Sequence, residues 1–248
     1  MRYFVEISYD GAQYHGWQRQ ENAVSVQQVV EEALSLILRA EITITGSGRT
    51  DTGVHCGQQY FHIDLENELD RQELLYKLNS LLPADISVNG LFPVDPAAHA
   101  RFTALSRSYE YRITRRKDPF LKGYAYHFYR PLNVALMNEA ASTLLGEHDF
   151  EALSKVKTDV DNFYCEISEA QWTLEGNILV FKVTANRFLR GMVRAMVGTL
   201  LEVGQGKLSV EQFRRVINSK DRRQAGSSAP AHGLFLTSVR YPGEIFVT

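Results

Sequence analysis

The sequence predicts an α+β protein of two ferredoxin-like halves, residues 1–100 and 101–248, each with the element order βαββαβ and an antiparallel sheet. Three observations indicate this fold class. The chain has 248 residues, of which 44% are hydrophobic, and this suffices for two domains of ordinary size. Strand-like and helix-like segments follow one another in a similar order in both halves. Gly176 lies in a short polar link between two apolar segments, as is typical of an antiparallel hairpin.

The first half begins with a strand at Arg2–Tyr9, where apolar residues alternate with others. A helix follows at Val24–Arg39, because apolar residues recur there at helical spacing and Ser25 can cap its start. The remaining elements are a strand at Ile42–Thr45 that leads into a glycine-rich loop, a strand at Gln59–Leu65, a helix at Arg71–Leu82 that Pro83 stops, and a strand at Ile86–Pro93.

The second half repeats this order with one additional helix. Its elements are a strand at Arg107–Thr114, a helix at Leu132–Gly146 ended by glycine, a hairpin of Ile167–Leu174 and Ile178–Thr184, helices at Phe188–Val203 and Val210–Asn218, and a last strand at Gly233–Tyr241. Residues 155–165 are rich in charge and residues 219–232 in Gly, Ser, Ala and Pro, so both are predicted to be surface loops.

The sequence shows no sign of a membrane or secreted protein. No apolar run approaches the ~20 residues that a membrane span needs, and the start of the chain lacks a signal-peptide pattern. Cys56 and Cys165 are too few and too far apart for a disulfide framework or a structural metal site. We therefore expect a cytoplasmic protein without a metal.

Charge is distributed unevenly, although the formal net charge is only −2. Residues 1–98 contain 6 Lys and Arg against 14 Asp and Glu, whereas residues 99–130 contain 8 against 2. A solvated hairpin surface would explain the basic middle segment. A surface that follows a phosphate backbone would explain it equally well, because affinity for nucleic acid depends on local charge.

The segment Gly46–His55, GSGRTDTGVH, places an arginine and an aspartate among three glycines. It does not match the dinucleotide fingerprint GxGxxG, since Asp51 stands where a glycine is needed, and it lacks the Lys and hydroxyl residues that end a phosphate-binding loop. The loop is therefore predicted to present the Asp51 carboxylate beside Arg49. A carboxylate that stays ionised next to a cation suits a nucleophile. The alternative is a turn aspartate that bonds its own backbone.

Two further segments contain candidate functional residues. In the apolar helix NRFLRGMVRAMVGTLLEVG, Arg194 is either a cation with its head in water or the ionic partner of a buried carboxylate, for which Asp51 is the natural candidate. In RSYEYRITRR, Tyr109 and Tyr111 point to one face of a strand. These rings either belong to the core or stack on an unstacked base, as in single-stranded RNA recognition.

The segment YDGAQYHGWQRQ near the amino terminus is predicted to be a structured loop that could line a groove. His55 either orients the neighbouring glycine loop or is a hydrogen-bonded structural histidine.

Taken together, these motifs resemble the tRNA pseudouridine synthase A family over essentially the whole chain. Five segments in the family's order carry the resemblance: YDGAQYHGWQRQ, GRTDTGVH, HARFTALSRSYEYRI, FLRGMVRAMVGTLLEVG and GLFLTSVRYP. Thr52 replaces the usual alanine of the family, and Gly46-Ser47 precede the shared core, but the Arg-Thr-Asp core is unchanged.

The resemblance implies the pseudouridine synthase fold, with an active site in a central cleft between the halves. It implies an isomerase (an intramolecular transferase) that converts uridine to pseudouridine at positions 38, 39 and 40 in the anticodon stem-loop of tRNAs, acts as a homodimer and uses neither a metal nor a cofactor. Asp51, Tyr109 and Arg194 match the catalytic aspartate, the active-site tyrosine and the helix arginine of the family. Substrate contacts are expected from Arg49, Arg101, Arg107 and Tyr109.

Two other classes of function fit part of the pattern. A non-catalytic RNA-binding or RNA-chaperone protein would explain the basic segment but gives no reason for a carboxylate in an RNA groove. An Asp-dependent nucleosidase or glycosidase would explain Asp51, but that class usually has paired carboxylates or a calcium cluster.

Overall fold

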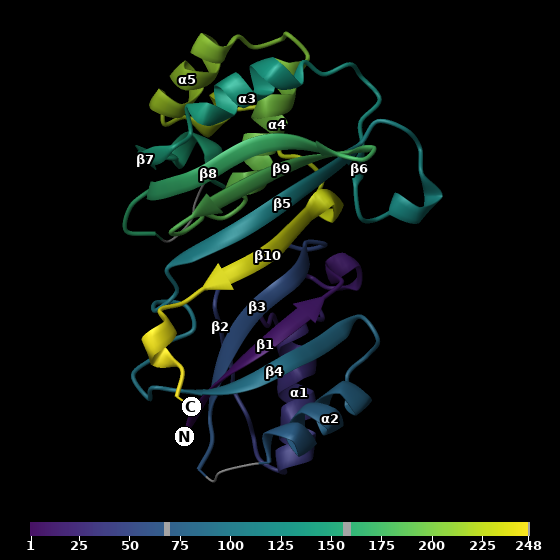
Figure 1. Cartoon of the computed structure of the whole chain (residues 1–248), viewed down its shortest axis with the longest axis vertical. Coiled ribbons are helices and arrows are strands. Elements are labelled where there is room, and N and C mark those ends of the chain that lie inside the picture. Colours follow the sequence, from purple (N-terminus) through teal and green to yellow (C-terminus); the bar gives the residue numbers. More distant parts are fainter. Residues whose placement is uncertain (67–69, 156–159, 248) are drawn as a thin grey trace. The chain divides into compact units, whose positions relative to one another are not determined.

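The structure, a computed structural model, describes residues 1–66, 70–155 and 160–247. The chain forms two compact units (Figure 1). The first contains Met1–Leu105 and also Leu236–Thr248, and the second contains Ser106–Phe235. The predicted halves, 1–100 and 101–248, thus differ from the compact units mainly at the end of the chain, because the last residues return to the unit in which the chain began.

The first unit contains a mostly antiparallel sheet in the strand order β4-β1-β3-β10. β1 pairs antiparallel with both β3 and β4, and the two-residue strand β2 pairs with β3. Helix α1 lies behind the strands in Figure 1 and contacts α2, which also packs against β4. The bounds are β1 Arg2–Tyr9, α1 Val26–Leu38, β2 Thr45–Gly46, β3 His55–Asp64, α2 Arg71–Leu81, β4 Ile86–Val94 and β10 Leu234–Arg240.

Both faces of this sheet are covered. Alternate side chains of a strand point to opposite faces, and β1 buries Val5 and Ile7 on one face and Phe4 on the other. The ring of Phe4 lies 4.9 Å from that of Tyr241 and 6.3 Å from that of Phe246, measured between centroids. The C-terminal residues therefore complete the core of the first unit.

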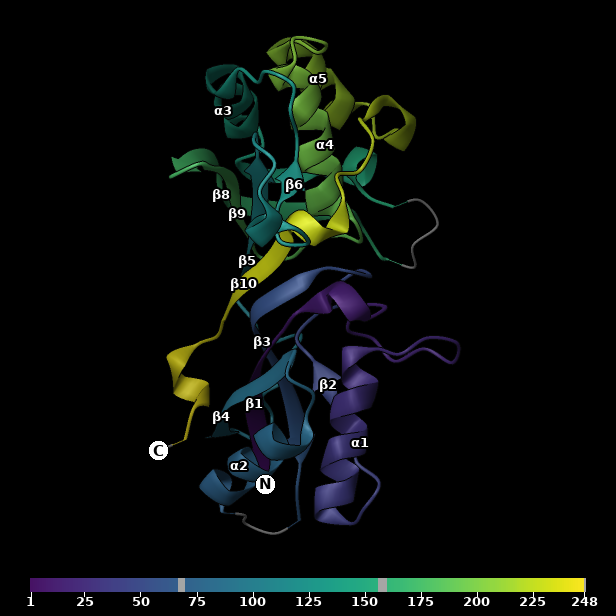
Figure 2. The same ribbon diagram turned by 90° about the vertical axis from the view of Figure 1, so that its right-hand side faces the viewer.

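The second unit has a sheet in the order β5-β9-β8-β7, in which the short strand β6 pairs parallel with β5 and the other pairs are antiparallel. Helices α3, α4 and α5 gather on one side of it (Figure 2). Gly176, with φ of +60°, lies in the link between β8 and β9, as the hairpin prediction requires. The bounds are β5 Ser106–Thr114, β6 Tyr126–His127, α3 Val134–Ser142, β7 Gly146–Asp149, β8 Tyr164–Glu175, β9 Ile178–Ala185, α4 Met192–Gly204 and α5 Val210–Asn218.

Helix α4 is almost entirely buried, and the loop 219–232 packs on it. As predicted, most residues of this loop are exposed or half-buried, but Ala229 is 3% exposed, and its N–H donates to the carbonyl of Arg194. The reason is Gly198 on α4, where a Cβ would lie 1.7 Å from the backbone oxygen of Ser227. A glycine in the helix therefore lets this segment pack directly on it.

The predicted fold class, α+β with antiparallel sheets, is confirmed, and the errors lie at the ends of elements. Gly191 adopts φ of +71° and α4 starts at Met192 rather than at the predicted Phe188, so Arg190 precedes the helix. α3 ends at Ser142 rather than at Gly146, because Gly146 begins β7.

The predicted loop 155–165 includes residues outside the described part of the chain. Among the described residues, no helix is long and apolar enough to span a membrane.

Candidate active site

Backbone hydrogen bonds with Tyr14 and Trp17 hold the glycine loop between β2 and β3. The amide of Trp17 donates to the carbonyl of Thr50 at 3.3 Å, and the amide of Gly53 donates to the carbonyl of Tyr14 at the same distance. The hydroxyl groups of Thr50 and Tyr9 lie 2.8 Å apart in the core. These contacts fix the loop on both sides of Asp51.

Two glycines are required by this arrangement. A Cβ at Gly46 would lie 2.3 Å from the indole nitrogen of Trp17, a side chain that is only 1% exposed and has no room to move. Gly53 adopts φ of +74°, a left-handed conformation in which other residues are strained. The glycines of the motif thus serve loop shape and close packing.

The loop presents the two predicted polar residues differently. Asp51 is half-buried, and its carbonyl accepts from the amide of Val54 at 3.1 Å, which forms a tight turn. Arg49 is exposed, and its Nε donates to Oε1 of Gln18 at 3.3 Å. Sequence reasoning missed Gln18, although it lies in the YHGWQRQ segment that was expected to line a groove.

His55 is a structural residue beside the loop. It is 2% exposed, and its Nδ1 lies 2.9 Å from Oδ1 of Asp10 and 3.2 Å from the amide nitrogen of Gly11. Of the two interpretations of His55, the hydrogen-bonded structural histidine agrees with this burial.

In the second unit, the two tyrosines of β5 have different environments. Tyr111 is fully buried, and its hydroxyl donates to the carbonyl of Pro230 at 2.8 Å. Burial, with a smaller contribution from Tyr126, raises the pKa of Tyr111 above its ordinary value. Tyr109 is half-buried, and its ring meets that of Phe188 edge-on at 5.0 Å between centroids. Tyr109 is therefore the more accessible of the pair.

Arg194 lies on the first turns of α4 and is half-buried. Its Nε donates to the carbonyl of Ala229 at 2.7 Å, while the amide of Ala229 donates back to the carbonyl of Arg194 at 2.9 Å. This double contact ties the guanidinium to the segment that packs on Gly198. Its positive charge opposes, to a small extent, the rise in the pKa of Tyr111 that burial causes.

The remaining predicted contacts lie on both units. Arg101 is exposed in the first unit, with its guanidinium carbon 5.4 Å from the ring centroid of Phe102. Arg107 lies on β5 of the second unit and donates to the carbonyl of Asn186 at 2.9 Å. The first unit thus contains Asp51, Arg49 and Arg101, and the second contains Tyr109, Arg107 and Arg194. A site that uses residues of both units stays a prediction.

Within the described ranges, no group of three or more His, Cys, Asp or Glu side chains is placed to hold a metal ion. Both cysteines are buried and free.

A half-buried aspartate on a loop held by hydrogen bonds on both sides is a candidate for a catalytic carboxylate. The model of the tRNA pseudouridine synthase family matches residues 6–103 and 140–242, and the chain belongs to this family. The resemblance stated from the sequence motifs is thereby confirmed.

The chain is also similar in sequence to curated relatives over nearly their whole length. The chain is 51% identical to tRNA pseudouridine synthase A of Bacteroides fragilis over 247 residues, which cover 99% of this chain and 98% of that protein. It is 52% identical to the protein of the same name from Bacteroides thetaiotaomicron, covering 99% and 92%, and 40% identical to that of Bacillus subtilis, covering 97% and 99%.

Proposed function

We propose that this protein converts uridine to pseudouridine at positions 38, 39 and 40 in the anticodon stem-loop of tRNAs, with Asp51 as the catalytic carboxylate. The observation that carries the proposal is the rigid loop between β2 and β3, which holds a half-buried aspartate one residue after a threonine bonded into the core. Preorganisation of this kind is what a nucleophile needs, because small displacements of a reacting group cost much of its rate.

The reaction fits an isolated carboxylate. Pseudouridine formation breaks the bond between ribose C1′ and N1 of uracil, rotates the base, joins C1′ to C5 and removes the C5 proton, while N1 gains a proton. Product and substrate are isomers, so no oxidant or reductant is consumed. The step needs an ionised carboxylate close to C1′ or C6 of a uridine that has left its stack, and Asp51 supplies it.

Tyr109 and Arg194 have complementary roles in the proposal. Tyr109, the accessible tyrosine of its pair, stacks on the flipped uracil, and stacking of this kind contributes ~1–3 kcal/mol against the few kcal/mol that flipping costs. Arg194 pairs with Asp51 and orients its carboxylate. Arg49, Arg101 and Arg107 contact the RNA backbone.

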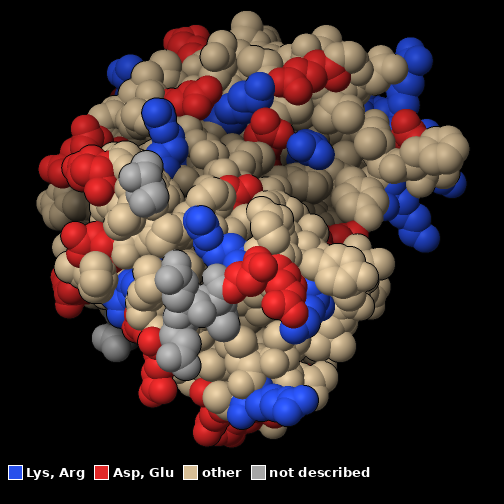
Figure 3. Space-filling view, turned by 60° about the horizontal axis from the view of Figure 1, so that its bottom comes forward, with Lys and Arg blue, Asp and Glu red and all other residues tan. Residues whose placement is uncertain are grey.

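The tRNA itself is expected to contact the basic segment of residues 115–130, which contains the connection between β5 and β6 and continues past β6. It contains Arg115, Arg116, Lys117, Lys122 and Arg130 against the single acidic residue Asp118. Figure 3 shows Lys and Arg side chains gathered at its protruding end. We further propose that the protein acts as a homodimer without a cofactor, as the resemblance implies, and in the cytoplasm, as the sequence features indicate. Light scattering during size-exclusion chromatography tests the dimer.

Asp51→Asn tests the catalytic role, because the amide keeps the shape of the side chain and removes its charge. The variant is expected to retain the melting temperature and tRNA affinity of the wild type and to lose at least ~10³-fold in rate, the scale for removing a catalytic nucleophile. The measurement is tritium release from tRNA labelled at C5 of uridine. Thr52→Ala, an exposed neighbour in the same loop, is the control and is expected to stay active.

Three outcomes would contradict the proposal. An active Asp51→Asn variant excludes Asp51 as the nucleophile. Free uracil among the products indicates a nucleosidase. Tight tRNA binding by the wild type without tritium release indicates an RNA-binding or chaperone protein.

A further inference from the structure

Helix α1 has two polar side chains on its buried face. Gln27 is 8% exposed and Glu31 is 4% exposed, although Val30 and Leu34 beside them belong to the apolar core. Residues four apart lie on one face of a helix. Burying a carboxylate costs several kcal/mol unless its oxygens are bonded, so the partners of these two groups indicate what they do.

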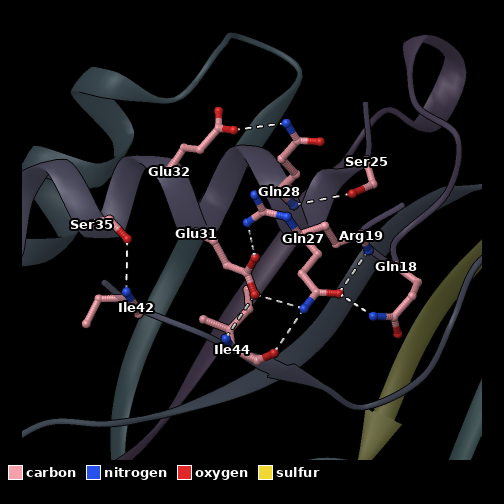
Figure 4. A network of polar contacts seen from close by, with 10 residues as sticks. All are labelled: Gln18, Arg19, Ser25, Gln27, Gln28, Glu31, Glu32, Ser35, Ile42 and Ile44. Carbon is pink, nitrogen blue, oxygen red and sulfur yellow. Dashed lines mark hydrogen bonds and ion pairs between the residues drawn. The ribbon is translucent and has the colours of Figure 1, made fainter. Parts of the chain in front are cut away.

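Glu31 connects three segments of the chain (Figure 4). Its Oε1 accepts from Nε2 of Gln27 at 2.9 Å and from the backbone amide of Ile44 at 3.2 Å. Its Oε2 accepts from Nη1 of Arg19 at 2.9 Å. Ile44 immediately precedes β2, so the buried carboxylate fixes the strand that enters the glycine loop.

Gln27 uses all of its hydrogen-bonding capacity in the same network. Its second N–H donates to the carbonyl of Ile44 at 3.1 Å. Its Oε1 accepts from Nε2 of Gln18 at 2.8 Å and from the backbone amide of Arg19 at 3.1 Å. The amide therefore holds the side chain of Gln18 in one orientation.

Gln18 extends the network to the loop itself. With its Nε2 bound to Gln27, its Oε1 accepts from Nε of Arg49 at 3.3 Å. A continuous path of hydrogen bonds thus runs from Glu31 through Gln27 and Gln18 to Arg49, two residues before Asp51. All of these residues belong to the first unit.

We infer that Gln18, Gln27 and Glu31 are positioning residues for uridine isomerisation. They set the direction of the Arg49 guanidinium and the entry of the loop that presents Asp51. Their effect on the reaction passes through Arg49 and the loop rather than through contact with the RNA, and the inference rests on the proposed function.

The same helix offers a matched control one residue further along. Nε2 of Gln28 donates to Oε1 of Glu32 at 2.9 Å, with the same spacing of four residues. This second pair is separate from the Gln27–Glu31 network in Figure 4, and Gln28 is half-buried and Glu32 exposed. Changes at Gln28 and Glu32 therefore reproduce the chemistry of changes at Gln27 and Glu31 outside the network.

A double-mutant cycle tests the inference. Gln18→Ala and Glu31→Gln are each combined with Arg49→Lys, which keeps the positive charge but lacks Nε. The single-turnover rate of pseudouridine formation is measured with saturating tRNA, and melting temperatures are recorded in parallel. Gln18→Ala and Glu31→Gln are each expected to slow the reaction ~10-fold, within the range for a catalytic loop that is slightly displaced. In the Arg49→Lys background Gln18→Ala is expected to slow it less than ~2-fold, whereas Glu31→Gln, which also loses contact with Ile44, keeps part of its effect.

Gln28→Ala and Glu32→Gln are expected to leave the rate within ~2-fold of the wild type, as for surface changes outside a network. The inference is overturned if Gln18→Ala is as fast as the wild type, or if it slows both backgrounds equally, because a general loss of stability would act in both. Gln18 is half-buried, so the comparison of Gln18→Ala in the two backgrounds can be made even if Glu31→Gln fails to fold. A wild-type protein that forms no pseudouridine would instead contradict the proposed function.

Discussion

His62 on β3 is a buried histidine that the structure keeps neutral. It is 7% exposed, and its Nδ1 accepts a hydrogen bond from the backbone amide of Ala100 at 3.1 Å. Burial lowers its pKa from 6.5 to about 4, and the charges of Arg2 and His99 contribute in the same direction. An unprotonated Nδ1 is required for this hydrogen bond, so geometry and titration agree.

Stability is therefore expected to depend on pH through His62. The unfolded chain binds a proton at this residue below pH 6.5, whereas the folded chain does so only below about pH 4. The free energy of unfolding does not depend on the titration of His62 above pH 6.5. It decreases as the pH falls from 6.5 to 4, because protonation of His62 then favours the unfolded chain. The loss amounts to at most about 3.5 kcal/mol, at ~1.4 kcal/mol for each pKa unit.

Urea denaturation at pH 7.0 and pH 4.5 measures this loss, and His62→Gln is the comparison. The amide oxygen of glutamine can accept from Ala100 and does not titrate, so the variant should lose less stability than the wild type between the two pH values. Equal losses would exclude His62 as the source of the pH dependence.

At the scale of single residues, the sequence identified candidate functional residues whose immediate neighbours in the chain form an unusual motif. Arg49 and Asp51 stand out because glycines flank them. Gln27 and Glu31 do not, since a polar pair four residues apart on a helix is ordinarily solvated, as Gln28 and Glu32 are. The buried pair is distinguished by its contacts with Gln18, Arg19 and Ile44, and these depend on tertiary structure.

Among the elements, the connection between β5 and β6 combines charge with exposed aromatic rings. Arg115, Arg116 and Lys117 are exposed, and Phe120, held in a short turn capped by Asp118, is 90% exposed. Large apolar side chains in such a position commonly mark an interaction site. Basic residues around an exposed ring are typical of surfaces that bind unstacked or single-stranded RNA.

Replacing Arg115, Arg116 and Lys117 together by Gln is expected to weaken tRNA binding. Each phosphate contact that is lost should reduce the slope of log affinity against log salt concentration by ~0.7–0.9. The single-turnover rate at saturating tRNA should stay unchanged, because these side chains act in binding. Filter binding between 50 and 200 mM salt measures the slope, over the range in which such contacts are decisive.

A second triple variant controls for net charge. Lys207, Arg214 and Arg215 are also exposed in the second unit, and their replacement by Gln removes the same charge. Equal weakening by both triple variants would indicate a general electrostatic effect and contradict a binding role for the connection.

The existence and type of most elements could be predicted, but several of their ends could not. Ser25 and the apolar spacing identified α1 because caps and periodicity are local signals. The start of α4 was missed because apolar residues continue the helical pattern before Gly191, whose left-handed φ breaks the helix. β7 carries the polar sequence Gly146–Asp149, which gives no strand signal, and it forms through pairing with β8.

For the whole molecule, the C-terminal residues matter because they belong to the core of the first unit. The hydroxyl of Tyr241 donates to the carbonyl of Ala100 at 2.6 Å. The amide of Val247 donates to the carbonyl of Pro93 at 3.0 Å, and the ring of Phe246 packs edge-on against that of Phe92. The sequence alone did not assign these residues to the first unit, since such an assignment requires contacts across more than a hundred residues.

A chain that ends at Arg240 is therefore expected to lose stability in the first unit. Removal of Tyr241, Ile245 and Phe246 should cost about 3–6 kcal/mol, at ~1.5–3 kcal/mol for each large apolar side chain that is fully buried, discounted here for partial burial. Hydrogen exchange followed by mass spectrometry should show faster exchange in β1 and β4 than in the full chain. The hairpin of β8 and β9 is the internal control, and equal acceleration there would contradict this assignment.

The return of the chain to its first unit also fixes the order in which the protein is completed on the ribosome. Residues Ser106–Phe235 form one uninterrupted unit inserted between the two parts of the other. At about 5–20 residues per second, their translation takes roughly 6–26 s. During that interval the earlier segment has been synthesised, but β3 lacks its neighbour β10 and the ring of Phe4 lacks its cover. The part of the nascent polypeptide that emerges first is thus the last to mature, and it presents an open sheet edge of the kind that chaperones protect.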